Sequence, residues 1–175
     1  MQFLHLTGLN EVDKVRAGYD AVQAKAVVRP FLSEMELALG AADVAISRAG
    51  ASSMAELAAM RLPAVLIPYP AATDNHQLHN ARTYVEAGAA VLFDQKHSDA
   101  EALSGALVKL FSDAAVRERM RRALDSFHHA GAAQLIAERM LALLSARSGR
   151  EPLRPAPRDA TGTPLHQCRQ IQPSR

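Results

Sequence analysis

The fold of this chain of 175 residues is decided by the stretch Val44-Ala45-Ile46-Ser47-Arg48-Ala49-Gly50-Ala51-Ser52-Ser53-Met54-Ala55-Glu56-Leu57. It begins with a short apolar run, continues through small residues around Gly50, and passes into a helical pattern near Ser53. A second such unit follows, with the apolar run Ala64–Ile67, a proline-rich loop and a helical pattern over His76–Ala87. Short, continuously apolar strands that alternate with helices are typical of a parallel sheet covered on both faces.

The same alternation extends to both sides of this stretch. Strands are predicted over Phe3–Leu6, Ala26–Val28, Val44–Ile46, Ala64–Ile67 and Ala89–Phe93. Helices are predicted over Asn10–Ala21, Ser33–Leu39, Ser53–Met60, His76–Ala87, Ala100–Phe111, Ala114–Phe127 and Gly131–Ala146. Repeated crossovers of this kind are right-handed, so the predicted fold class is α/β, a Rossmann-like doubly wound parallel sheet with C-terminal helices.

The composition argues against several function classes. The longest apolar runs are shorter than the ~18–20 residues of a membrane-spanning helix, and we expect neither such a span nor a secretory signal. Cys168 is the only cysteine, which excludes a disulfide framework and a Cys-rich zinc site and fits a reducing cytosol. Aromatic residues make up 5% of the chain and tryptophan is absent, so we do not expect a protein that stacks single-stranded bases.

The end of the sequence has a different character. Residues 147–175 hold five of the nine prolines and carry a net charge of +4, which leaves −2 for the rest of a chain whose total is +2. This mildly acidic remainder gives no case for nucleic-acid binding. We predict a folded domain over residues 1–146 and a disordered, basic, proline-rich tail over 147–175. A solvated tail is favoured, and contact of its arginines with an anionic membrane is the alternative.

The first candidate site follows the strand Val44–Ile46. Gly50 allows a tight turn, and the N-terminus of the next helix offers free N–H groups to a phosphate. Arg48 can add a charged fork, and Glu56 can accept hydrogen bonds from ribose hydroxyls. Ser53 and Glu56 also have the spacing of a capping box, which satisfies helix N–H groups without any ligand. On spacing alone, the capping interpretation is favoured.

The second candidate site follows the strand Ala64–Ile67. Asp74 stands where an N-cap is expected, with Gln77 three residues later to complete a capping box. Polar side chains gather in the first helical turns: His76, Gln77, His79 and Asn80. A sugar or phosphate contact is favoured there, and a solvated helix start is the alternative. His76 and His79 could share a metal ion, but no third ligand stands out, so no metal site is expected.

Together these motifs resemble the C-terminal domain of the MurG family, GT-B enzymes of glycosyltransferase family 28. The resemblance extends from about Phe3 to about Ala146. It is carried by Pro30–Met35, Ala42–Val44, Ser47–Ala51, Ala55–Ala59, Pro63–Pro68, Asp74–Ala81 and Glu86–Ala90. The motifs are specific in combination, although each alone occurs in other GT-B enzymes. The family transfers GlcNAc from UDP-GlcNAc to lipid I, with inversion, and forms lipid II in peptidoglycan biosynthesis.

The resemblance implies a role for each candidate residue. It implies that Glu56 binds the ribose hydroxyls, that Arg48 lies beside the nucleotide-sugar, and that the backbone at Leu32 contacts the uracil. It also implies that Gln77 and Asn80 meet the sugar. It sets three small residues beside the diphosphate: Ala51, Ser52 and Ser53. Gly50 is also counted in the UDP-GlcNAc site. Some relatives have glutamine in place of His76, which leaves the role of that residue open. Neither a metal nor a cofactor is implied.

The chain also departs from the family pattern. The family's C-terminal domain opens with a strand and a Gly-Gly-Ser-x-Gly loop that holds the pyrophosphate, and neither precedes Phe3 in this sequence. The N-terminal domain, which in the family supplies the acceptor site, the proposed catalytic base and the main membrane-docking patch, is missing as well. We therefore expect an N-terminally truncated donor-binding domain that is inactive alone.

The expected partners follow from the resemblance. They are UDP-GlcNAc and, through a missing N-terminal domain or a separate chain, the lipid I acceptor, as in the eukaryotic two-chain enzyme for lipid-linked GlcNAc. The expected location is the cytoplasm or the cytoplasmic face of the inner membrane, with peripheral attachment only. The alternatives are a non-catalytic remnant, a UDP-sugar-binding subunit that needs a partner, or another GT-B glycolipid glycosyltransferase.

Overall fold

The computed structural model describes residues 1–148 and divides the chain into two units, Met1–His129 and Ala130–Arg175. The described part of the second unit contains one helix, α7, over Ala132–Ser148. Apart from Arg147 and Ser148, which end α7, the predicted tail lies outside the described residues. None of the helices in residues 1–148 combines the length and the apolar character needed to cross a membrane.

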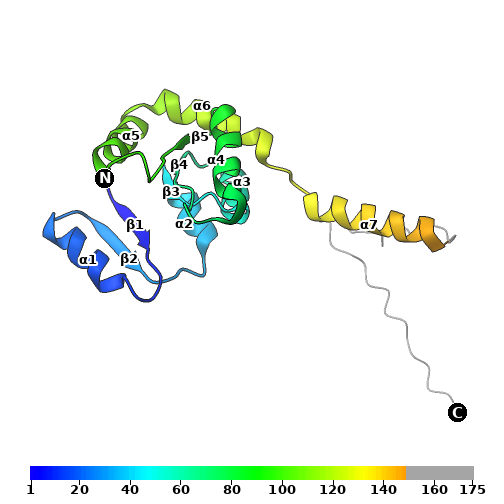
Figure 1. The fold of residues 1–175 in the computed structure, drawn as a ribbon, viewed down its shortest axis with the longest axis horizontal. Coiled ribbons are helices and arrows are strands. Elements are labelled where there is room, and N and C mark those ends of the chain that lie inside the picture. The colour runs from blue at the N-terminus through cyan, green and yellow to red at the C-terminus, as the bar shows by residue number, and fades with distance from the viewer. Residues whose placement is uncertain (149–175) are drawn as a thin grey trace, which may run out of the picture. The chain divides into compact units, whose positions relative to one another are not determined.

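The first unit alternates strands and helices as the sequence predicts (Figure 1). Its strands are β1 (Phe3–Leu6), β2 (Ala26–Arg29), β3 (Ala45–Ser47), β4 (Ala64–Leu66) and β5 (Ala90–Leu92). Its α-helices are α1 (Val12–Ala21), α2 (Met35–Ala41), α3 (Ala51–Ala59), α4 (His76–Glu86), α5 (Ala100–Ser112) and α6 (Ala114–Leu124). Short 3₁₀ turns, η1 (Thr73–Asn75) and η2 (Asp125–Phe127), precede α4 and follow α6.

All five strands pair in parallel, which confirms the α/β class, but they form two sheets and not one continuous sheet. β1 pairs with β2, and β4 lies between β3 and β5. Across Figure 1 the strands follow in the order β2, β1, β3, β4, β5. In doubly wound sheets of the order 3-2-1-4-5-6 the first strand lies between strands 2 and 4 and so joins the two halves. Within residues 1–148 no strand lies between β1 and β3, so the halves remain separate.

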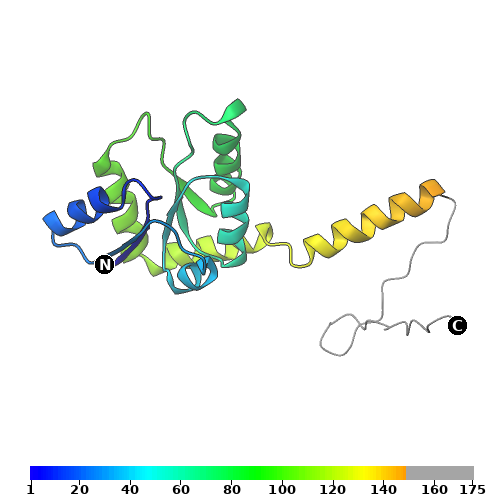
Figure 2. The same cartoon turned by 90° about the horizontal axis from the view of Figure 1, so that it is seen from below.

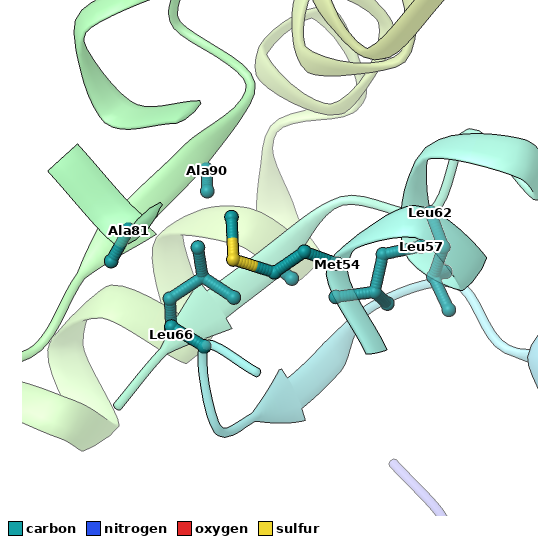
Figure 3. Packing of buried hydrophobic residues seen from close by; sticks show 8 residues of the cluster. Met54, Leu57, Leu62, Leu66, Ala81 and Ala90 are labelled. Carbon is teal, nitrogen blue, oxygen red and sulfur yellow. The ribbon is translucent and has the colours of Figure 1, made fainter. Parts of the chain in front are cut away.

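Helices cover both faces of the three-stranded sheet (Figure 1, Figure 2). Alternate residues of a strand point to opposite faces. On one face Leu66 packs with Met54 and Leu57 of α3 and with Ala81 of α4 (Figure 3). On the other face, a cluster joins Val65 of β4 to α5 and α6 through Leu110 and Met120. β4 is therefore buried on both sides, as its continuous apolar run predicts.

The two-stranded sheet is covered by α1 on one face. Tyr19 of α1 packs its ring 5.5 Å from that of Phe3, and its hydroxyl lies 3.1 Å from Nδ1 of His5. The opposite face, with the register pair Leu4 and Val27, is exposed. Residues on this sheet are therefore less buried than those on β4.

We predict that Leu66→Ala lowers the free energy of unfolding by about 2–5 kcal/mol, because it leaves a cavity between β4, α3 and α4. The side chain of Leu66 is fully buried (0% exposed), whereas that of Leu37 on α2 is 66% exposed. Leu37→Ala is the matched control and should change stability by less than about 0.5 kcal/mol. Urea unfolding followed by circular dichroism measures both variants. Equal losses in the two variants would contradict this packing.

Candidate functional site

The carboxyl ends of three strands meet at one edge of the β3–β5 sheet. The register aligns Ser47 of β3 with Leu66 of β4, and Leu66 with Leu92 of β5. Ligands of doubly wound sheets bind at this edge, where loops lead into helices. The loop after β3 carries Arg48, and the loops after β4 and β5 carry Tyr69 and Gln95.

The loop after β3 leads directly into α3. Gly50 is the N-cap, with extended backbone angles of φ −70° and ψ 144°, and the backbone N–H of Met54 donates to its carbonyl oxygen over 3.0 Å. The N–H groups of Ala51, Ser52 and Ser53 therefore lack partners inside the helix. Ala51 and Ser52 are exposed and Ser53 is half-buried. This helix start offers hydrogen-bond donors and a positive dipole end to an anion.

The capping-box interpretation of Ser53 and Glu56 is wrong. α3 begins at Ala51, so Ser53 is already inside the first turn, and no side chain caps the helix. Within residues 1–148 the Glu56 carboxylate has neither a hydrogen-bond nor an ion-pair partner, and it is exposed. Glu56 lies four residues after Ser52, on the same face of the helix. A free carboxylate thus stands one turn beyond the exposed N–H groups.

Arg48 links the three loops. Its Nη1 donates to the carbonyl oxygens of Ile67 and Pro68 over 3.2 and 3.4 Å, and to Oε1 of Gln95 over 3.1 Å. Its guanidinium carbon lies 5.6 Å from the centre of the Tyr69 ring, within the range of a cation–π contact. The side chain remains exposed, so the positive charge is available at this edge.

The start of α4 differs from the prediction. Asp74 is not the N-cap, because Asn75 occupies that position without a side-chain cap, and the predicted Asp74–Gln77 capping box does not form. Asp74 and Asn75 both have left-handed backbones, with φ of 52° and 51°. Oε1 of Gln77 instead accepts from the backbone N–H of Tyr69 over 2.9 Å.

The amides of Gln77 and Asn80 are each held at one end. Nδ2 of Asn80 donates to the carbonyl oxygen of Ala49 over 3.2 Å and so connects α4 with the loop before α3. The N–H of Tyr69 needs an acceptor, so Gln77 must present its amide oxygen to it. The carbonyl oxygen of Ala49 needs a donor, so Asn80 must present its amide nitrogen. Nε2 of Gln77 and Oδ1 of Asn80 have no partner within residues 1–148. The structure thus places Asn80 beside the loop after β3 and Gln77 beside the loop after β4.

The structure places His76 at the start of α4, beside Gln77, whereas Leu32 follows β2 of the other sheet. Nδ1 of His76 donates to the carbonyl oxygen of Thr73 over 2.7 Å, which holds the imidazole against the loop. His79 is exposed, and no group of three metal-ligating side chains occurs in the described part of the chain. Leu32 lies between β2 and α2, at the carboxyl end of the other sheet. Within residues 1–148 no hydrogen bond engages its backbone N–H or C=O.

Sequence reasoning missed the loop after β5. Gln95 and Asp94 follow this strand as Arg48 follows β3, and the rule that ligands bind at the carboxyl ends of strands could have pointed to them. Oδ2 of Asp94 lies 2.8 Å from Nδ1 of His97, and its Oδ1 accepts from the backbone N–H of Lys96 over 2.9 Å. The hydrogen bond from His97, with that from Lys96, lowers the pKa of Asp94.

With this geometry in place, comparison with known proteins gives a clear result. The sequence profile of the glycosyltransferase family 28 C-terminal domain matches residues 1–136. The chain belongs to glycosyltransferase family 28. The matched region includes every candidate residue from Leu32 to Asn80.

Two curated relatives of this chain have the same enzyme name. The UDP-N-acetylglucosamine--N-acetylmuramyl-(pentapeptide) pyrophosphoryl-undecaprenol N-acetylglucosamine transferase of Anaeromyxobacter sp. is 37% identical over 149 residues, which is 85% of this chain and 39% of the relative. The enzyme of the same name from Chlorobaculum tepidum is 42% identical over 137 residues, or 78% of this chain and 37% of the relative. The chain therefore spans about two fifths of the length of these relatives.

A solved structure supports the fold assignment. The crystal structure of Acinetobacter baumannii MurG superposes with a TM-score of 0.69 at 29% identity, covering 76% of this chain and 40% of that protein. The described fold is part of the C-terminal domain of a GT-B glycosyltransferase, as the sequence predicts.

We predict that Ser53→Ala changes the free energy of unfolding by less than about 0.5 kcal/mol, because Ser53 does not cap α3. Asp99 provides the matched comparison, since its Oδ1 accepts from the backbone N–H of Ala102 over 2.9 Å at the start of α5. Asp99→Ala should cost about 1 kcal/mol, the usual loss of an N-cap. Chemical denaturation of both variants provides the measurement. A larger loss for Ser53→Ala than for Asp99→Ala would restore the capping box.

We predict that Asp94 titrates below its ordinary value of 3.8 and that His97→Ala raises its pKa toward that value. Because the folded pKa is depressed, the stabilisation is fully present above the unfolded pKa and is lost as the pH falls through the folded pKa. An NMR titration of the Asp94 carboxyl carbon measures the pKa. His129→Ala, at an exposed histidine, is the control and should leave it unchanged. An unchanged pKa in His97→Ala would refute the proposed cause.

Proposed function

We propose that this chain is the donor-binding part of an inverting glycosyltransferase that transfers GlcNAc from UDP-GlcNAc to lipid I and forms lipid II in peptidoglycan biosynthesis. The names of its family 28 relatives support the donor and the acceptor. The observation that carries the proposal is the Glu56 carboxylate, which has no partner in the described part of the chain and lies near the exposed start of α3.

The spacing along α3 fits a nucleoside diphosphate. Glu56 is four residues beyond Ser52, an axial distance of about 6 Å at 1.5 Å per residue. A diphosphate on the N–H groups of Ala51, Ser52 and Ser53 then leaves Glu56 within reach of the ribose hydroxyls, where an acidic residue accepts hydrogen bonds in related folds. Gly50 keeps the approach to these N–H groups free of a side chain.

The other candidate residues complete the proposed site. Arg48 adds positive charge near the diphosphate, and the free backbone groups of Leu32 are available to the uracil edge. The free amide ends of Gln77 and Asn80 supply one donor and one acceptor to sugar hydroxyls. His76 precedes Gln77 in α4, and we assign it no separate role.

The proposed mechanism requires no metal at this site. The acceptor hydroxyl attacks the anomeric carbon of GlcNAc, the bond to the diphosphate breaks with inversion, and negative charge grows on the leaving UDP. The fixed N–H groups of α3 and the guanidinium of Arg48 stabilise that charge. None of the described residues is assigned as the base that takes the hydroxyl proton. We propose that a further N-terminal domain or a separate chain supplies that base, the acceptor site and peripheral contact with the cytoplasmic membrane face.

We expect the purified chain to bind UDP-GlcNAc and Glu56→Ala to weaken the binding by about 1–3 kcal/mol, the value of a lost hydrogen bond to a charged group. Isothermal titration calorimetry measures both proteins. Glu101→Ala is the matched control, because Glu101 is an exposed glutamate in the first turn of α5 and has no role in the proposal. It should bind as the parent does.

Two results would count against the proposal. Equal affinities of the parent and Glu56→Ala would remove Glu56 from the site. No binding by a chain that circular dichroism shows to be folded would favour a non-catalytic remnant over a donor-binding subunit.

A further inference from the structure

The Arg48 guanidinium is anchored along one side only. Its Nη1 has two hydrogens, and these are shared by three acceptors: the carbonyl oxygens of Ile67 and Pro68, and Oε1 of Gln95. Within residues 1–148, Nε and Nη2 have no hydrogen-bond partner. Three of the five guanidinium N–H groups are therefore free, on an exposed side chain.

Two side chains determine this arrangement. Of the three acceptors that bind Nη1, one is a side-chain atom, Oε1 of Gln95. The other two are backbone carbonyl oxygens, which any sequence would provide. Tyr69 supplies the aromatic ring 5.6 Å from the guanidinium carbon. The backbone of Tyr69 is in turn held by Gln77 of α4. The network thus joins the loops after β3, β4 and β5 to the start of α4.

We propose that Gln95 and Tyr69 are positioning residues that hold Arg48 with its free Nε–Nη2 edge toward a phosphate oxygen of the donor. This edge is a planar fork that matches two oxygens of one phosphate. Arg48 precedes the first residue of α3 by three positions, so the fork and the N–H groups of Ala51 and Ser52 are close along the chain. Fixing the fork before the ligand arrives reduces the entropy lost on binding. The inference rests on the proposed function, because it concerns how the same diphosphate is held.

The first experiment needs no ligand and follows the Nε–Hε signal of Arg48 by ¹⁵N NMR. In the parent we expect a resolved signal with restricted motion. Gln95→Leu and Tyr69→Leu should both increase that motion, whereas Tyr69→Phe keeps the ring and should preserve the parent signal. Gln134→Leu is the control, because the side chain of Gln134 donates to Glu138 within α7 and is no part of the Arg48 network. An unchanged Arg48 signal in Gln95→Leu would overturn the proposal.

The second experiment measures binding of UDP and of inorganic pyrophosphate by calorimetry. Gln95→Leu should weaken both by about two- to tenfold, the range for one lost hydrogen bond. In the Arg48→Ala background the same substitution should have no effect, because Gln95 acts through Arg48. Equal losses in the two backgrounds would show that Gln95 acts independently of Arg48 and would overturn the proposal.

The two probes separate this inference from the proposed function. In one outcome, pyrophosphate binding depends on Gln95, UDP binds no more tightly than pyrophosphate, and Glu56→Ala has no effect. This outcome would overturn the proposed function and support the positioning of Arg48. In another outcome, UDP binding weakens in Glu56→Ala but is unaffected by Gln95→Leu and Tyr69→Leu. This outcome would support the proposed function and overturn the positioning of Arg48. A folded chain that binds neither probe would overturn both.

Discussion

The parallel register of β3, β4 and β5 is the constraint on which the site depends. It ends the three strands level, at Ser47, Leu66 and Leu92, so that the next residues of each loop project from one edge. Burial of β4 on both faces holds this register, because a shift by one residue would turn Val65 and Leu66 to the wrong helices. A guanidinium can bridge the loops only because the strands end together.

The chemistry of the site depends on where α3 begins. A helix that started at Ser53 would use the serine hydroxyl and the Glu56 carboxylate to satisfy its own N–H groups. With Gly50 as N-cap, the helix starts earlier, its first N–H groups stay free of intrahelical partners, and the Glu56 carboxylate has no partner among residues 1–148. The Ser53 hydroxyl and the Glu56 carboxylate, which would otherwise cap the helix, are therefore available to a ligand. The small residues around Gly50 serve the same end, because they leave the backbone open.

Much of the fold could be predicted from the sequence. The strands and most helices lie within a few residues of their predicted positions, because apolar runs and helical periodicity report burial directly. The sequence predicts one doubly wound sheet, and the division into two differs from it because no strand within residues 1–148 lies between β1 and β3. The helix starts near Ser53 and Asp74 also differ from the prediction. The sequence has the spacing of a capping box at both places, but Gly50 is the N-cap of α3 and Asn75 is the N-cap of α4. The roles of Gln95 and Tyr69 needed coordinates, because their partners lie far away in the sequence.

The separation into two sheets affects how the chain behaves at high concentration. Two sheets have four edges where one sheet would have two, and each edge presents backbone N–H and C=O groups that another polypeptide can pair with. The exposed Leu4 and Ile46 on β1 and β3 add apolar surface beside such edges. The strands are only three or four residues long, which limits the hydrogen bonds that any one edge can form with a neighbour. The short strands thus limit the pairing with other chains that the additional edges would allow.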